Sequence, residues 1–124
     1  MITGIGIDIV RVKRMEHWLQ NPKLLERYFH TDELATARSR GNTAALTLAA
    51  RFAAKEAFGK ALGTGLADIT LKDIMVVNKD NGQPVIKLFD SAQKAFEKSG
   101  AKYAHISLTH ERDNAIAMIV LEGE

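Results

Sequence analysis

A long alanine-rich segment contains the run Arg51-Phe52-Ala53-Ala54-Lys55-Glu56-Ala57-Phe58-Gly59-Lys60, and this run decides the central element of the fold. Alanine has the highest intrinsic helix propensity, and Gly63 follows where a helix commonly ends. The segment therefore predicts one long helix over residues 43–62. On that helix Phe52, Glu56 and Lys60 share one face, because residues four apart lie one above another. A carboxylate and an ammonium converge there, with Lys55 on the flank.

This convergence has two interpretations. A carboxylate among cations suits a divalent metal held beside phosphate groups. The same pattern also fits an ordinary exposed pair between Glu56 and Lys60, which stabilises a helix by only about 0.2–0.5 kcal/mol.

The amino-terminal run Gly4-Ile5-Gly6-Ile7-Asp8-Ile9-Val10 predicts a strand over about residues 2–9. Its alternation puts the isoleucines on one face and Gly4, Gly6 and Asp8 on the other. Glycine weakens a strand interior, and a common reason to keep it is the close approach of a ligand or of another backbone. Alternatively, Asp8 is a partial cap where the strand turns into a helix at Arg11.

The run Tyr103-Ala104-His105-Ile106-Ser107-Leu108-Thr109-His110 predicts a second strand, followed by a turn at residues 111–114 and a third strand through Leu121. Alternation places His110 at the end of the apolar stripe formed by Ala104, Ile106 and Leu108. A histidine at the mouth of a hairpin fits a structural role as well as a functional one.

The rest of the chain predicts short helices and one more hairpin. We expect helices over residues 11–20, from the Asn21-Pro22 cap through Phe29, from a Thr31 cap, and over residues 88–99. Strands are expected near residues 69–78 and 84–87, joined through the Asp80-Asn81-Gly82 turn. Helices inserted between strands, with hairpins at the end, predict an α+β fold.

Length and composition fit one domain over residues 1–124, without cysteine and therefore without disulfides or a cysteine nucleophile. No signal-like or membrane-length apolar segment stands out, so a cytoplasmic enzyme is the simplest expectation. The net charge of +2 divides into +4 for residues 1–62 and −2 for residues 63–124. This excess is too small for a generic nucleic-acid surface and suits a localised acidic partner. The alternative class is a non-catalytic module that binds nucleotides or a nucleic-acid backbone through Arg51, Lys55 and Lys60.

Taken together, the motifs resemble the 4'-phosphopantetheinyl transferases, in particular their small holo-acyl-carrier-protein synthase group. That family has Gly-x-Asp near the start and an aromatic residue followed by x-x-Lys-Glu-Ala/Ser-x-x-Lys. These positions read Gly6-Ile7-Asp8 and Phe52 through Lys60 here, and the Ser107-Leu108-Thr109-His110 and Asn81-Gly82-Gln83-Pro84 runs also fit the small group.

The resemblance implies transfer of 4'-phosphopantetheine from coenzyme A to a serine of apo acyl carrier protein, in lipid and fatty acid biosynthesis. It implies an antiparallel sheet with one long central helix and several short helices. It also implies Mg²⁺, or alternatively Mn²⁺, and a homotrimer with active sites between neighbouring subunits.

Within that framework, Asp8 and Glu56 are expected to hold the metal, and Lys60 to neutralise phosphate oxygens. His110 is expected to contact the coenzyme or to take the serine proton. A metal-bound water or Glu56 are alternatives for the base that takes this proton. Arg51 and Lys55 have secondary phosphate or structural roles. The expected coenzyme-binding residues are Arg51, Phe52, Lys55, Gly59, Lys60, Gly63, Asn81, Gly82, Gln83, Pro84 and His110, with the Gly63-Thr64-Gly65 turn and residues 81–84 as walls.

The first predicted helix offers a surface for the acidic carrier. Arg11, Arg14 and Trp18 recur at roughly helical spacing, with Lys13 beside them, opposite an apolar stripe. The expected partner-binding residues are therefore Arg11, Lys13, Arg14 and Trp18. The alternative is a solvated basic face with a partly buried tryptophan.

Overall fold

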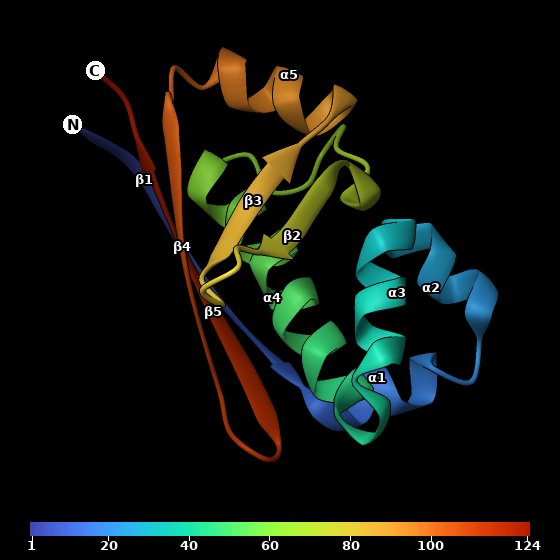
Figure 1. The fold of residues 1–124 in the computed structure, drawn as a ribbon. Helices are drawn as coiled ribbons and strands as arrows, with labels where there is room; N and C mark the ends of the chain where they lie inside the picture. The colour runs from blue at the N-terminus through green and yellow to red at the C-terminus, as the bar shows by residue number, and fades with distance from the viewer.

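The predicted long helix is the element on which the rest of the chain packs. In a computed structural model that describes residues 1–124, it is α4 (Ala44–Leu62), preceded by the short 3-10 helix η1 (Gly41–Thr43). Gly63 ends α4 in the left-handed conformation, with φ of 82°, as its place in the sequence predicted. Figure 1 shows α4 between a sheet on one side and three short helices on the other.

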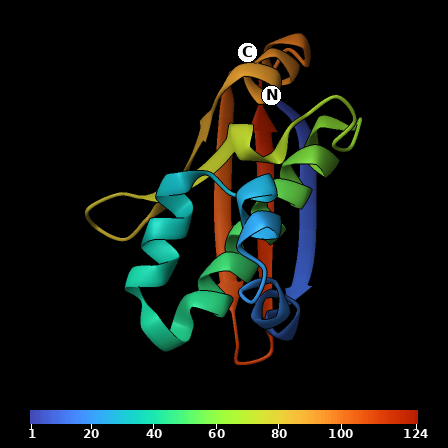
Figure 2. The same cartoon turned by 90° about the vertical axis from the view of Figure 1, so that its right-hand side faces the viewer.

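The main sheet has three antiparallel strands in the order β1-β5-β4. They are β1 (Ile2–Arg11), β4 (Tyr103–His110) and β5 (Asn114–Glu122). The register aligns Asp8 of β1 with Ala117 of β5, and Ala117 with Leu108 of β4. Figure 2 shows the strands side by side behind α4. Asp8 and His110 therefore belong to opposite edges of one sheet.

The glycines of β1 face α4 at very short range. A Cβ on Gly6 would lie 1.9 Å from the carbonyl oxygen of Ala57, and one on Gly4 would lie 1.9 Å from that of Ala61. The backbone of α4 cannot move aside for an added Cβ, as the end of a flexible side chain could. The sequence suggested that these glycines allow the close approach of a ligand or of another backbone. In the structure it is the backbone of α4 that approaches them. This contact brings Asp8 next to the C-terminal half of α4.

We expect Gly6→Ala to destabilise the fold by at least about 3 kcal/mol, because the methyl group forces the sheet away from the helix. Gly41→Ala is the matched control, since nothing lies within 4 Å of its Cβ position and only its positive φ of 57° is strained. That control should cost about 1–2 kcal/mol. Urea unfolding of both variants measures the difference, and equal losses would contradict the close-packing explanation.

A two-stranded sheet and α5 complete the C-terminal half. The hairpin joins β2 (Ile74–Asn78) to β3 (Pro84–Leu88), and α5 spans Asp90–Lys98. The strand predicted near residues 69–78 is shorter than expected, because the 3-10 helix η2 (Leu71–Asp73) occupies its first part. The helix predicted from residue 88 begins later, because Leu88 belongs to β3 and Phe89 is extended.

Three short helices cover the other side of α4: α1 (Val12–Trp18), α2 (Pro22–Tyr28) and α3 (Thr31–Ser39). Asn21 caps α2 as predicted, since its side chain accepts from the backbone N–H of Leu24. The prediction that Thr31 caps α3 is wrong. His30 is the cap: its Nδ1 accepts from the N–H of Asp32, while the Glu33 carboxylate accepts from the N–H of His30.

The outer face of the main sheet carries apolar side chains without cover from any helix (Figures 1 and 2). Ile5, Ile7 and Ile9 are 60%, 56% and 58% exposed, and Met118 and Tyr103 extend the same face. A contiguous apolar patch of this kind commonly marks a protein interface. None of the helices combines the length and hydrophobicity needed to cross a membrane.

Candidate active site

Two charged side chains of α4 reach solvent on a helix that is otherwise buried almost all round. They are Glu56, which is half-buried, and Lys60, which is exposed. Lys60 Nζ donates to Asp8 Oδ1 at 3.0 Å and to the carbonyl oxygen of Ile7 at 2.9 Å. These contacts join β1 to α4 at the point that the glycines bring together. We call Asp8, Glu56 and Lys60 the carboxylate face.

Glu56 differs from the exposed helix pair that the sequence left open. Lys60 pairs with Asp8, and Glu56 forms no ion pair of its own. Burial raises the pKa of Glu56, and the nearby charge of Asp8 raises it further, against the opposite effects of Arg14 and Lys60. Asp8 is not a helix cap either, because Arg11 precedes α1 without any side-chain cap bond.

The carboxylate face fits a hard divalent cation that also binds the substrate. Two carboxylates repel one another across this site, and a cation between them would relieve that repulsion. No cluster of three or more His, Cys, Asp or Glu side chains is present that could enclose a metal alone. Mg²⁺ is usually held by one or two carboxylates, with water and phosphate oxygens as its other ligands. The donor set therefore suits a metal that arrives with a phosphate ester.

An aromatic cluster lies beside the carboxylate face. Trp18 stacks on Tyr28 with ring centroids 5.2 Å apart and meets Phe52 edge-on at 5.1 Å. The guanidinium of Arg14 lies 5.1 Å from the Trp18 ring centroid and 5.0 Å from that of Phe52. Phe52 is buried beneath these groups, so its ring supports this surface, and its expected contact with the coenzyme stays a prediction.

A second polar cluster lies on the opposite side of α4. Arg51 precedes Glu56 by five residues, and each residue turns the helix by about 100°, so the two side chains point roughly 140° apart. Arg51 and Thr47 instead border a hollow of about 370 Å³ with His110 of β4. Its lining residues are Arg40, Thr43, Leu46, Thr47, Ala50, Arg51, Asn78, Gly82, Pro84, Leu108 and His110. We call it the cationic hollow.

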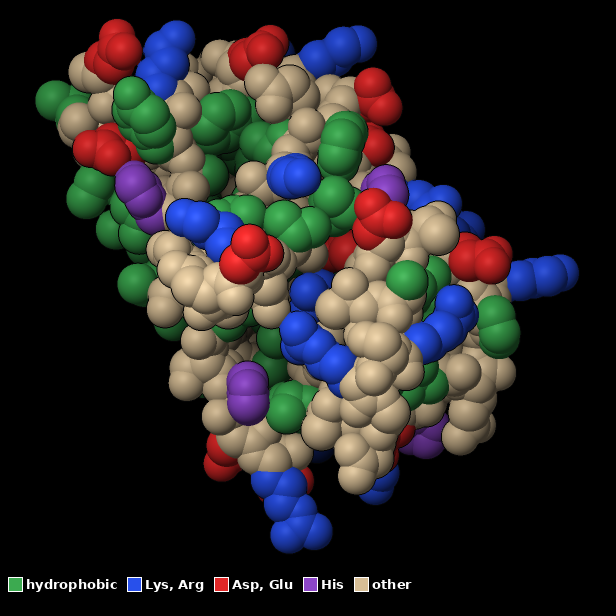
Figure 3. Space-filling model, viewed as in Figure 1, with side chains coloured by type: hydrophobic (Ala, Val, Ile, Leu, Met, Phe, Trp, Pro, Cys, Tyr) green, Lys and Arg blue, Asp and Glu red, His purple; other side chains and the backbone are tan.

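The cationic hollow suits an anionic ligand. Arg51 is 3% exposed and donates through Nε to the carbonyl oxygen of Val76 at 3.2 Å, while neither Arg51 nor Arg40 has a carboxylate partner within 4.0 Å. Burial lowers the pKa of Arg51; Glu33 opposes this effect and Arg40 adds to it. Figure 3 shows Lys and Arg side chains gathered over the N-terminal half of α4, beside the β2–β3 turn. The sequence interpretation missed Arg40 and Thr47, although Thr47 precedes Arg51 by one helical turn.

Lys55 lies in neither cluster. Its side chain is fully buried, and Nζ donates to Glu33 Oε1 at 2.7 Å and to the carbonyl oxygen of Leu71 at 3.0 Å. This placement favours the structural one of its two predicted roles. Arg51, Lys55 and Lys60 therefore lie in three different environments, so within one chain they do not converge on one ligand as the alternative binding module expects.

The predicted nucleotide-pocket walls lie in different places within one chain. Gly82 and Pro84 line the cationic hollow, whereas the Asn81 side chain accepts from the N–H of Gln83 and shapes the turn. Thr64 borders a groove against α5 instead. Gly59 allows the segment after α4 to pack closely, because a Cβ there would lie 2.9 Å from Leu66.

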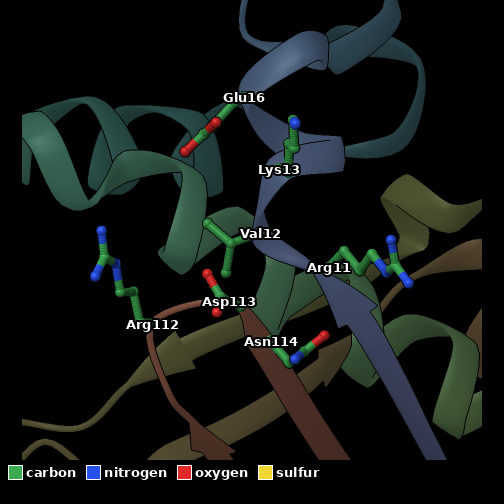
Figure 4. Close-up of a pocket in the computed structure, with 7 residues that line it drawn as sticks. All are labelled: Arg11, Val12, Lys13, Glu16, Arg112, Asp113 and Asn114. Carbon is green, nitrogen blue, oxygen red and sulfur yellow. The ribbon is translucent and has the colours of Figure 1, made fainter.

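The predicted partner-binding residues also separate. Arg11 is the last residue of β1, so it does not continue the helical spacing of Arg14 and Trp18. Figure 4 shows Arg11 and Lys13 around a hollow that α1 shares with Arg112 and Asp113 of the β4–β5 turn, and their side chains point in different directions. Arg14 and Trp18 belong instead to the aromatic cluster beside Glu56.

Two carboxylates with a lysine, and a separate cationic hollow, suit an enzyme that transfers phosphate-containing groups. The chain belongs to the 4'-phosphopantetheinyl transferase superfamily, whose family pattern it matches over residues 4–119. A holo-[acyl-carrier-protein] synthase from Treponema denticola is 54% identical over 123 residues, which are 99% of this chain and 100% of that protein. One from Trichlorobacter lovleyi is 48% identical, with 99% of each chain covered.

Solved structures agree with this assignment. The holo-[acyl-carrier-protein] synthase of Neisseria meningitidis superposes with a TM-score of 0.88 at 33% identity, covering 98% of this chain and 99% of that one. A synthase from Bacillus anthracis, solved in complex with CoA (3',5'-ADP), gives a TM-score of 0.83 at 36% identity over 100% and 99% of the two chains. The predicted α+β fold is therefore confirmed.

Proposed function

We propose that this protein transfers the 4'-phosphopantetheine group from coenzyme A to a serine of apo acyl carrier protein and releases adenosine 3',5'-bisphosphate. The observation that carries the proposal is the carboxylate face, where Asp8, Glu56 and Lys60 meet on the α4–β1 contact. Its relatives share the chain length and the arrangement of elements. We further propose that residues 1–124 form one domain that works in the cytoplasm.

The reaction requires charge neutralisation more than covalent chemistry. The serine oxygen attacks the β-phosphorus of coenzyme A, its proton is removed, and the bond to the oxygen that bridges the two phosphorus atoms breaks. The electron pair leaves on adenosine 3',5'-bisphosphate. Positioning and electrostatic stabilisation supply most of the catalysis in such transfers. Lys60, which donates to Asp8, would offset charge that develops on the phosphate oxygens.

Asp8 and Glu56 would hold Mg²⁺, or Mn²⁺ in its place. When bound, the cation supplies Lewis-acid polarisation of the diphosphate. Glu56 must be ionised to act as a ligand. Because its pKa is raised, the ionised fraction of its side chain falls as the pH drops through that raised value. His110 and Glu56 remain the side-chain candidates for the base that takes the serine proton.

We propose that one active site takes its two halves from neighbouring subunits. Within one chain the carboxylate face and the cationic hollow lie on opposite sides of α4, so a single ligand reaches both only across an interface. Such an interface joins two different surfaces, and contacts of this type form a ring when the rotation between neighbouring subunits closes. The apolar outer face of the sheet offers area for assembly. A homotrimer is the ring that the family resemblance implies.

The carrier is proposed to dock on Arg14 and Trp18, next to the carboxylate face. An acidic segment of the carrier would meet the Arg14 guanidinium, which the aromatic rings hold in place. Arg11 and Lys13 around the hollow of Figure 4 would extend this contact. Exposed charges of this kind mainly raise the association rate.

A direct assay tests the proposed function. The protein is mixed with coenzyme A, Mg²⁺ and an apo acyl carrier protein, and the carrier is weighed by mass spectrometry. We expect the carrier to gain the mass of one 4'-phosphopantetheine group, and we expect excess EDTA to abolish the gain. Coenzyme A binding without any transfer would instead support the non-catalytic module.

A further inference from the structure

We infer that Glu33 and Lys55 form a positioning pair, which fixes strand β2 on α4 and thereby sets the shape of the cationic hollow. The pair touches neither the carboxylate face nor the hollow, and the proposed function needs it only indirectly. The kinetic consequence rests on the proposed function, whereas the structural consequence does not.

The buried ammonium group of Lys55 makes all of its hydrogen bonds to groups inside the protein. Besides Glu33 and the carbonyl oxygen of Leu71, Nζ donates to the carbonyl oxygen of Ile74 in β2. A lysine ammonium has three donors, and all three have partners here. Burial lowers the pKa of Lys55, and the Glu33 carboxylate acts in the opposite direction. The side chain is therefore committed to these contacts and has no donor left for a phosphate.

Glu33 is equally committed. It is 1% exposed; Oε1 also accepts from the N–H of His30 at 2.9 Å, and Oε2 accepts from the N–H of Val76 at 3.1 Å. The carboxylate therefore joins the start of α3 to β2, and Lys55 joins both to α4. No buried side-chain nitrogen or oxygen lacks a partner in this network.

The network takes the place of a neighbouring strand. Successive residues of a strand direct their backbone groups to alternate sides, and those of Ile74 and Val76 face away from β3. Lys55 donates a hydrogen bond to the carbonyl oxygen of Ile74. The carboxylate of Glu33 accepts from the N–H of Val76, and Arg51 donates to the carbonyl oxygen of Val76. These three side chains satisfy a strand edge that would otherwise be buried without partners.

The strand that is held in this way leads directly into the cationic hollow. Asn78 ends β2 and lines the hollow, and Gly82 and Pro84 follow across the turn. Arg51 also lines the hollow, and its hydrogen bond to Val76 depends on the position of the same strand. A shift of β2 along α4 would therefore move the wall of the hollow and one of its cations together.

Two variants test the inference. Lys55→Met removes the ammonium and leaves Glu33 buried without a cation. Glu33→Gln combined with Lys55→Met removes both charges, so this second variant remains informative if the first does not fold. Lys98→Met is the matched control, because Lys98 is exposed at the end of α5.

Hydrogen exchange measured by mass spectrometry gives the structural result. We expect amides of residues 74–88 to exchange at least about tenfold faster in both variants, with β1 and β5 unchanged and the control like the wild type. An equal acceleration in every segment, or none in residues 74–88, would overturn the inference. This result does not depend on whether the protein transfers phosphopantetheine.

Steady-state kinetics gives the functional result. We expect KM for coenzyme A to rise at least about tenfold in the double variant, while KM for the carrier changes less than about twofold. A merely structural role would lower the active fraction, and thus kcat, without separating the two KM values; that outcome would overturn the inference. An inactive wild-type protein would contradict the proposed function and leave the exchange experiment to decide on the pair.

Discussion

Glu56→Gln is expected to lower the rate of carrier modification by about 100- to 1000-fold, with little change in stability. A neutral amide is a poor ligand for a hard cation, and the substitution removes one of only two carboxylates at the site. Glu56 forms no ion pair and its pKa is raised by burial, so the fold does not depend on its charge. The measurement is turnover at saturating Mg²⁺, together with a thermal unfolding curve.

Glu26→Gln is the matched control for this experiment. Glu26 is exposed on α2 and forms no ion pair, and the same chemical change there should leave turnover within about twofold of wild type. Near wild-type turnover of Glu56→Gln at saturating Mg²⁺ would remove Glu56 from the metal site. A large loss that accompanies unfolding would show that the residue supports the fold instead.

The long helix and the strand faces were predictable because their signals are local. Alanine density, the terminating Gly63 and the alternation of glycine with isoleucine act within a few residues of the positions that they determine. The separation of Arg51 from Glu56 was also predictable from the sequence, because two residues that lie five apart in a helix point to different faces. Treating the run as one cluster of cations was the error.

Other features depend on contacts that are distant in sequence. The burial of Lys55 requires Glu33, which lies 22 residues earlier, and carbonyl groups of residues 71 and 74. Arg40 joins the hollow only because β4 and the β2–β3 turn fold over α4. No local pattern carries this information.

The cap of α3 was missed for a different reason, because its contacts are local. Threonine is a common cap, so Thr31 was chosen, whereas the structure uses the less common Nδ1 of His30, which accepts from the N–H of Asp32.

The largest reversal of activity is expected when two inactive variants are combined. Glu56→Gln destroys the carboxylate face and leaves the cationic hollow intact. His110→Glu does the opposite, because it places a carboxylate in the cationic hollow, which suits an anionic ligand, on a residue that is exposed at the end of β4. We expect His110→Glu alone to lower turnover at least about tenfold through repulsion.

Co-refolding equal amounts of these two variants should restore about a quarter of wild-type activity, because random assembly into rings gives that share of interfaces two intact halves. Mixing the two variants after each has folded separately tests whether subunits must exchange before activity returns.

The assembly itself is measured by light scattering, which should return three times the 13.7 kDa chain mass for each sample. Ile7→Glu, on the apolar outer face, should reduce both the mass and the recovery. If the mixture stays as inactive as its components while the assemblies form and mix, each active site lies within one chain, and the opposite placement of the two clusters on α4 requires another explanation.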